Sequence, residues 1–205
     1  MLRKLADGIA AGIMISLGGS VFLAVRGQSA VAAAVLFSVA LICICTKGFL
    51  LFTGRVGYMV ESHKREDWSA LLLGLFGNFA GTAVCGAAIR FAFSDYAATA
   101  ADICGSKLEQ SLPGAAIRAI FCGILMYLAV SIYREKQSIV GIVFCIPVFI
   151  LSGFEHSIAD MFYFAVSGII SLPALCYILI IILGNALGGI LIPLLGLAGK
   201  EKHNA

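Results

Sequence analysis

Charged residues are scarce in this chain, which has 14 Lys and Arg and 11 Asp and Glu among 205 residues, a charged fraction of 12%. A soluble domain carries roughly twice that fraction. Hydrophobic residues instead make up 61% of the chain, and the 23 glycines suit helices that pack closely within a bilayer. The composition therefore excludes an ordinary soluble domain and indicates an integral membrane protein.

Metal-binding cysteine motifs are also missing. The seven cysteines show neither a CxxC pair nor a Cys/His spacing typical of zinc sites. Most stand in apolar runs, where a free cysteine behaves as a small hydrophobe. We therefore expect no metal, no structural disulfide and no cofactor, and the partners we expect do not include nucleic acid.

Long apolar stretches are abundant. A helix needs about 20 residues to cross a bilayer, and six stretches qualify: 6–25, 30–60, 69–92, 114–133, 138–165 and 173–197. The second and fifth are too long for one plain helix, and each has polar residues in its middle. This pattern predicts helices 2 and 5 broken within the membrane, whose irregular residues lie inside protein or line a cavity.

Lys and Arg predict the orientation. They gather at the N-terminus, in the 61–67 loop, in the 134–137 loop and in the tail, where Lys200 and Lys202 lie. The other side has few, so with six spans both termini should be cytoplasmic. The N-terminus could be taken for a signal peptide, but similar spans recur along the chain, so we expect a retained first helix in the cell membrane.

The two halves of the chain repeat one another, over about 1–95 and 110–200. LFGNFAGT (75–82) returns as ILGNALGG (182–189), KGF (47–49) as SGF (152–154), and AAGIMI (10–15) as FCGILM (121–126). Each half has an odd number of spans, so the second half enters the membrane from the opposite side. The prediction is an all-α, 3+3 inverted repeat in a single transmembrane domain, with a substrate path between the halves.

Ionisable residues interrupt both predicted breaks. His156 could be a core histidine satisfied by a backbone carbonyl, but at membrane depth a functional, pore-lining role is favoured. Lys47 could snorkel to the interface, yet it lies in the middle of its span, which favours a pore role or pairing with Glu155 or Asp160. We expect both carboxylates to be structural, holding the break open.

Three other polar side chains complete the candidate set. Asn78 and Asn185 occupy the repeat-related GN positions among glycines, where their amides could cap backbone groups freed by the breaks. Lys107 lies in the predicted outer loop 93–113. It is either a solvated surface lysine or a vestibule lysine that draws anions by its local field.

Taken together, these motifs resemble the formate–nitrite transporter family over nearly the whole chain. SGFEHSIADMF (152–162) is similar to the family's fifth-helix motif G-[FY]-E-H-x-x-A-N-M, and TKGFLLFTGR (46–55) to its second-helix T-G-x-x-L-F-T-G-N. LFGNFAG and LGNALGG match the GN motifs of helices 3 and 6. The spacing from Lys107 to Cys122 matches a lysine fifteen residues before the Cys of a family C-N motif.

The resemblance implies an aquaporin-like fold of six helices, assembled as a homopentamer in the lipid bilayer with one pore per protomer. It implies passage of formate, nitrite, hydrosulfide or short carboxylates, as anions or conjugate acids. His156 would face the pore between two apolar constrictions, and Lys107 would help attract the anion. Phe149 and Phe37 are the candidate constriction residues, and Thr46 is included among the pore residues.

Four departures from the family pattern set this chain apart. By register on LFTG, Lys47 replaces a pore-facing threonine, opposite His156. Gly123 replaces the Asn after Cys122, an expected partner of the histidine. Arg55 and Asp160 each replace an Asn, and they are expected to form an ion pair with each other.

These observations predict a channel or proton-coupled transporter for small monovalent anions, because burying a bare charge between apolar constrictions is costly unless a proton accompanies it. One alternative is an aquaporin-like channel for a small neutral solute, although the asparagines do not stand in an NPA-type motif. An enzyme is not expected, since no cysteine nucleophile adjoins His156 in the sequence.

Overall fold

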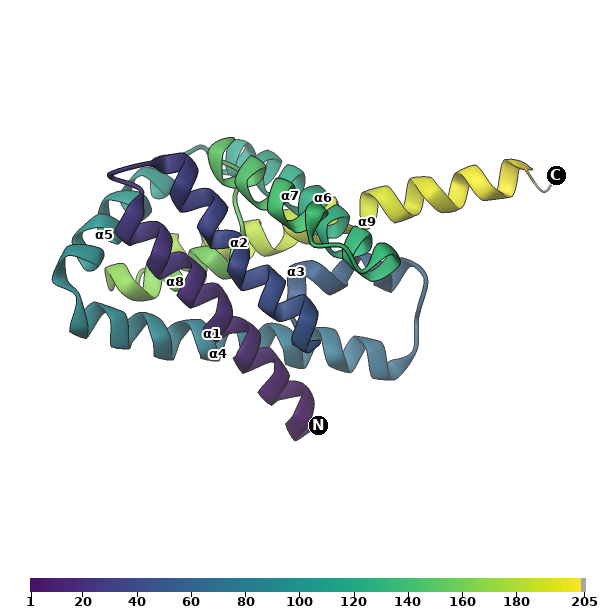
Figure 1. Ribbon diagram of the computed structural model, residues 1–205, viewed down its shortest axis with the longest axis horizontal. Coiled ribbons are helices and arrows are strands. Elements are labelled where there is room, and N and C mark those ends of the chain that lie inside the picture. Colours follow the sequence, from purple (N-terminus) through teal and green to yellow (C-terminus); the bar gives the residue numbers. More distant parts are fainter. Residues whose placement is uncertain (204–205) are drawn as a thin grey trace.

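The computed structural model describes the backbone of residues 1–203 and the side chains of residues 1–198, so the side chains of Lys200 and Lys202 lie outside the described part. The described chain is all-helical (Figure 1). Its elements are α1 (Leu2–Val25), α2 (Ala30–Lys47), α3 (Phe52–Arg55), η1 (Val56–Val60), α4 (Arg65–Ala92), α5 (Ser94–Leu108), α6 (Leu112–Lys136), α7 (Val140–Leu151), α8 (Ser157–Ser167) and α9 (Leu172–His203).

Five of these helices, α1, α2, α4, α6 and residues 172–198 of α9, are long and apolar enough to cross a membrane. Helices α7 and α8 are shorter and apolar. Large hydrophobic side chains such as Phe76, Phe144 and Leu183 are exposed on the outside of the bundle, as expected for a surface that faces lipid rather than water. In Figure 1 the end of α9 projects beyond the other helices, at the right of the view.

Both of the overlong apolar stretches are interrupted. Helix α2 ends at Lys47, Gly48 has a left-handed backbone with φ of 73°, and a new helix begins only at Phe52. In the second half, α7 ends at Leu151, Gly153 has φ of 67°, and α8 begins at Ser157. A glycine supplies each left-handed turn at no steric cost.

The predicted loop at 93–113 is wrong as a description of this segment. Residues 94–108 form α5, and residues 109–111 alone connect it to α6. The segment is poor in long apolar runs, which hid its helical periodicity, but Ala100 and Cys104 are completely buried. They share one face, at a spacing of i, i+4. Helix α5 packs this face against α8 and thereby carries Lys107 into the protein.

Two repeat-related helix pairs, α1 with α4 and α6 with α9, make the closest contacts of the bundle. A Cβ added at Gly12 would lie 2.5 Å from the carbonyl oxygen of Asn78, and one at Gly123 would lie 2.3 Å from that of Asn185. No side chain fits at such distances, so backbone meets backbone, as in small-residue contacts of membrane helices. The two halves are thus built on the same crossing.

Candidate functional site in the central cavity

Asn78 and Asn185 make matching hydrogen bonds at the two breaks. The Asn78 amide donates to the carbonyls of Gly8 and Leu50, and its Oδ1 accepts from the backbone N–H of Phe52 at 2.9 Å.

Asn185 repeats the pattern in the other half. Its amide donates to Ala119 and Glu155 carbonyls at 2.8 Å each, and its Oδ1 accepts from the N–H of Ser157 at 2.8 Å. Each asparagine therefore satisfies the backbone on both sides of a break, and these are the contacts that the GN positions suggested. Both side chains are completely buried, where an unmet backbone group would be costly.

His156 lies at the end of the second break and is fixed through both ring nitrogens. Its Nδ1 accepts from the backbone N–H of Ala159 at 3.1 Å, which makes His156 the N-cap of α8. Its Nε2 lies 2.9 Å from Oγ1 of Thr53, on α3 of the opposite half. Because Nδ1 is an acceptor, the neutral ring carries its proton on Nε2 and donates to Thr53. This arrangement leaves the hydroxyl hydrogen of Thr53 free for another acceptor.

Two phenylalanines pack beside this pair. The ring of Phe149 stacks on His156, with centroids 5.6 Å apart, and meets the ring of Phe37 edge-on, with centroids 6.3 Å apart. All three side chains line a cavity of about 360 Å³. Arg26, Arg118 and Asp102, each exposed to solvent, also line it. The cavity thus has a wall of aromatic rings and histidine, and exposed charges elsewhere along its lining.

The same cavity contains a buried cluster of three charged groups. The ammonium of Lys107 lies 2.9 Å from Oδ1 of Asp160 and also pairs with Glu155. Glu155 additionally accepts a hydrogen bond from Gln110 at 2.9 Å. Lys107 is therefore not a solvated surface lysine, since its side chain is 13% exposed and both carboxylates are 3% exposed or less.

The pairings predicted for Lys47 and Arg55 are wrong. Lys107 is the ionic partner of Glu155 and Asp160. Thr53, and not Lys47, lies at His156. Lys47 ends α2 with an exposed side chain, and the neighbouring Thr46 is also exposed and donates to carbonyls of its own helix. The register on LFTG had placed Lys47 opposite His156. The break after Lys47 instead separates it from α3, the helix that carries Thr53.

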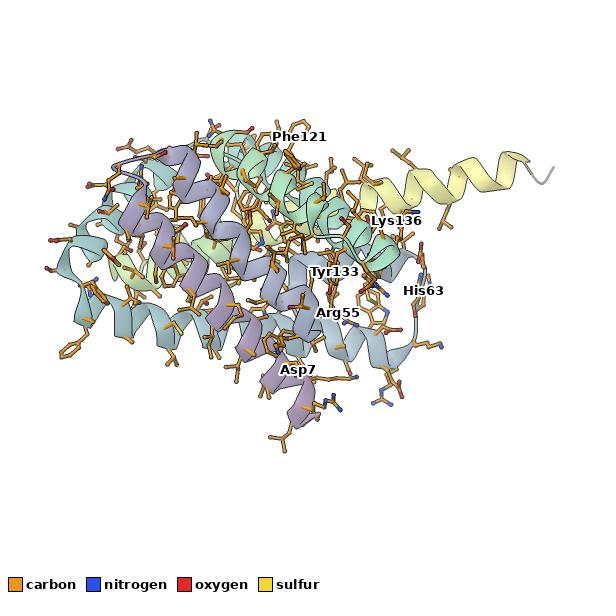
Figure 2. The ribbon with its side chains drawn as sticks, in the orientation of Figure 1. Asp7, Arg55, His63, Phe121, Tyr133 and Lys136 are labelled. Atoms are coloured by element: carbon orange, nitrogen blue, oxygen red, sulfur yellow. The ribbon has the colours of Figure 1, made fainter. Side chains whose placement is uncertain are left out.

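Arg55 lines a second cavity, of about 260 Å³, together with Tyr133 and Arg134. Arg55 and Tyr133 lie near one another in the view of Figure 2, between α3 and the end of α6. The guanidinium of Arg134 lies 3.9 Å from the ring centroid of Tyr58, a cation–π contact. This cavity is likewise bordered by apolar residues such as Leu41 and Leu51.

Sequence reasoning overlooked Thr53, Gln110 and Arg118. Thr53 carried a signal, since it lies in the FTG turn that begins the second half-helix, at a place equivalent to the start of α8. Gln110 and Arg118 carried none, because their place depends on how α5 and α6 pack. Gly123, in turn, contacts α9 rather than His156. Among the described residues, no group of three His, Cys, Asp or Glu could hold a metal ion.

The fold and this site define a multi-pass membrane protein with a cavity lined by both aromatic and charged side chains. A model of the formate/nitrite transporter family matches residues 1–198, so the chain belongs to that family of transporters and channels, which are not enzymes.

Similar proteins agree with this assignment. An uncharacterized transporter of Bacillus subtilis (strain 168), YwcJ, is 29% identical over 220 residues, which cover 92% of this chain and 85% of that protein. A solved pentameric formate channel with formate bound has a TM-score of 0.81 at 22% identity, covering 100% of this chain and 98% of that one. A channel described as an FNT family ion channel has a TM-score of 0.78 at 21% identity, covering 97% and 88%. At such identities the two structures establish the fold.

Proposed function

We propose that the protein is a homopentameric channel or proton-coupled transporter for small monovalent anions such as formate, nitrite, hydrosulfide or short carboxylates. Six spans in a 3+3 inverted repeat, with α2–α3 and α7–α8 as its broken helices, place both termini in the cytoplasm. Each protomer has its own pore, and the cavity at His156 is the pore's central part.

The observation that supports this function best is His156 in the wall of the aromatic cavity, with the buried Thr53 hydrogen-bonded to it from the opposite half. Two apolar rings, Phe37 and Phe149, narrow the space beside it. The oxygen of the Thr53 hydroxyl accepts the hydrogen bond from Nε2 of His156, so its hydrogen is left to donate to another group. A small anion, or the acid formed from it, can enter the cavity beside His156 while the apolar rings exclude larger hydrated ions.

The surrounding residues have supporting roles in this proposal. Arg26 and Arg118 raise the local concentration of anions in the cavity through their field, while Lys107 offsets part of the negative charge of Glu155 and Asp160. On the other side, Arg55 and Arg134 border the second cavity, which we assign to the cytoplasmic mouth. Pore roles for Thr46 and Lys47 stay predictions, with both side chains exposed at the end of α2.

Proteoliposome transport tests the proposal. Uptake of formate, nitrite, hydrosulfide, acetate and lactate is measured at two pH values, in vesicles with and without the protein. We expect at least one of these anions to enter faster with protein, and faster at acid pH because the proton removes most of the cost of burying the charge. Swelling in glycerol without any anion uptake would instead identify a channel for neutral solutes.

A further inference from the structure

The cluster of Lys107, Glu155 and Asp160 has a charge imbalance. One ammonium stands between two carboxylates, which leaves a net charge of −1 when all three are ionised. Asp160 is 1% exposed, and among the described residues its Oδ2 has no hydrogen-bond partner. A buried, unpaired negative charge is expensive, and a buried carboxyl commonly takes up a proton instead.

We propose that Asp160 is a proton-binding site whose occupancy controls the access of anions to the central cavity. This inference rests on the proposed function. With the proton bound at Oδ2, the cluster is neutral and an anion can approach His156. Without it, the cluster repels the anion, because Asp160 and Glu155 line the same cavity as His156.

The neighbours of Asp160 support a proton as the occupant. Oδ1 is already engaged by Lys107 at 2.9 Å, so Oδ2 is the oxygen left to bind it. The titratable and charged groups facing the cluster come from the break and from α1, α5, α6, α8 and α9: Arg26, Asp102, Cys104, Lys107, Arg118, Cys122, Glu155, His156, Tyr163 and Tyr177. Glu155 is the other carboxylate of the cluster. Both of its oxygens accept hydrogen bonds, one from Lys107 and one from Gln110.

The proton exchange itself is simple. The O–H bond forms at Oδ2 with a proton from water that reaches the cavity, and it breaks by returning the proton to water. No electrons are transferred. The family motif G-[FY]-E-H-x-x-A-N-M has an Asn where this chain has Asp160. An amide does not take up a proton near neutral pH, so the proposed proton site belongs to this chain and not to the family pattern.

The test measures isotopic formate exchange in proteoliposomes with equal formate and equal pH on both sides, over a pH series. Under these conditions the supply of formic acid is the same for every variant and cancels in a ratio of rates. The variants are Asp160→Asn, which keeps the shape and removes the charge, and Asp95→Asn, a matched control on an exposed carboxylate of α5 that lines neither cavity.

We expect the ratio of Asp160→Asn to wild-type rates to be near one at acid pH. The ratio should rise at least about tenfold at alkaline pH. There the negative charge of Asp160 in the wild type lowers the occupancy of the cavity by an anion by at least that factor. The Asp95→Asn ratio should stay near one throughout. An Asp160→Asn ratio that stays near one at every pH, in protein that melts like the wild type, would overturn the proposal.

A second measurement separates this inference from the proposed function. Infrared difference spectra of the protein without formate should show a protonated carboxyl band that titrates with pH and is missing in Asp160→Asn. If wild-type vesicles exchange none of formate, nitrite, hydrosulfide, acetate and lactate but the band titrates, the transport proposal fails and the proton site stands. If formate exchanges while the band is unchanged in Asp160→Asn, the proton site is refuted. An exchange rate that changes with sodium concentration at constant pH, but not with pH, would also refute the proton site.

Discussion

At the scale of single residues, the central feature is a histidine whose two nitrogens have different tasks. Nδ1 caps α8 and Nε2 meets Thr53 across the interface between the halves. The sequence identified His156 through its unusual place in an apolar run. It did not identify Thr53, because hydroxyl residues are common in membrane helices and because its partner is 103 residues away.

Removing the hydroxyl of Thr53 should impair transport more than folding. In Thr53→Val the shape is kept, but the Nε2–H of His156 loses its acceptor, which costs about 1–3 kcal/mol when the group is buried. We expect formate exchange to fall severalfold or more. The measurement is proteoliposome exchange together with a thermal melt in detergent.

Thr53→Ser is the matched control, since it restores the hydroxyl with one methyl fewer. It should recover most of the transport lost in Thr53→Val. Equal rates in the valine and serine variants would show that the hydroxyl takes no part.

At the scale of elements, the two breaks are held by one device used twice. Sequence repeats placed Asn78 and Asn185 beside the breaks, and the structure shows their amides on the freed backbone groups. This was predictable because both the motif and the rule that buried backbone must be satisfied are local. The helix at 94–108 was not, because only its packing on α8 reveals which face is buried.

Asn185→Leu should destabilise the protein strongly. It leaves the carbonyls of Ala119 and Glu155 and the N–H of Ser157 without their partner, at about 1–3 kcal/mol for each group. A clear drop in the detergent melting temperature is expected, and Asn78→Leu should have a similar effect. A variant at either position that melts like the wild type would contradict the capping role.

Adding a methyl group at the α6–α9 crossing should also destabilise the fold. In Gly123→Ala the new Cβ would lie 2.3 Å from the Asn185 carbonyl oxygen, and overpacking of this kind costs about 1–3 kcal/mol. Gly105→Ala on α5 is the control, because a Cβ there meets no atom within 4 Å. It should melt no lower than the wild type, since alanine favours helix. Equal melting temperatures for the two variants would refute the close contact.

At the scale of the whole molecule, composition was enough to predict a helical membrane protein, and the motifs at the breaks were enough to predict its family. They were not enough for the charge arrangement. Lys107, Glu155 and Asp160 are up to 53 residues apart in sequence, and the lysine reaches the carboxylates because α5 packs against α8. Pairings of this kind depend on tertiary packing that no single stretch encodes.

The proposed homopentamer predicts the mass of the assembly, and the six proposed spans predict where the termini lie. Native mass spectrometry of the detergent-solubilised protein should give five copies of the 21.5 kDa chain. Reporter domains fused to the N- and C-termini should both be cytoplasmic, because an even number of spans puts them on one side and the Lys and Arg distribution favours the cytoplasm. A monomeric mass, or reporters on opposite sides, would contradict the proposed assembly or the six-span topology respectively.

The close crossing at Gly123 also limits which residues this position accepts in the present chain. An asparagine here would force α6 and α9 apart, because its side chain cannot enter a gap that excludes even a Cβ. A single exchange to the family's asparagine is therefore not tolerated by this fold, and a variant that carries it needs further changes that loosen the neighbouring contacts of α9.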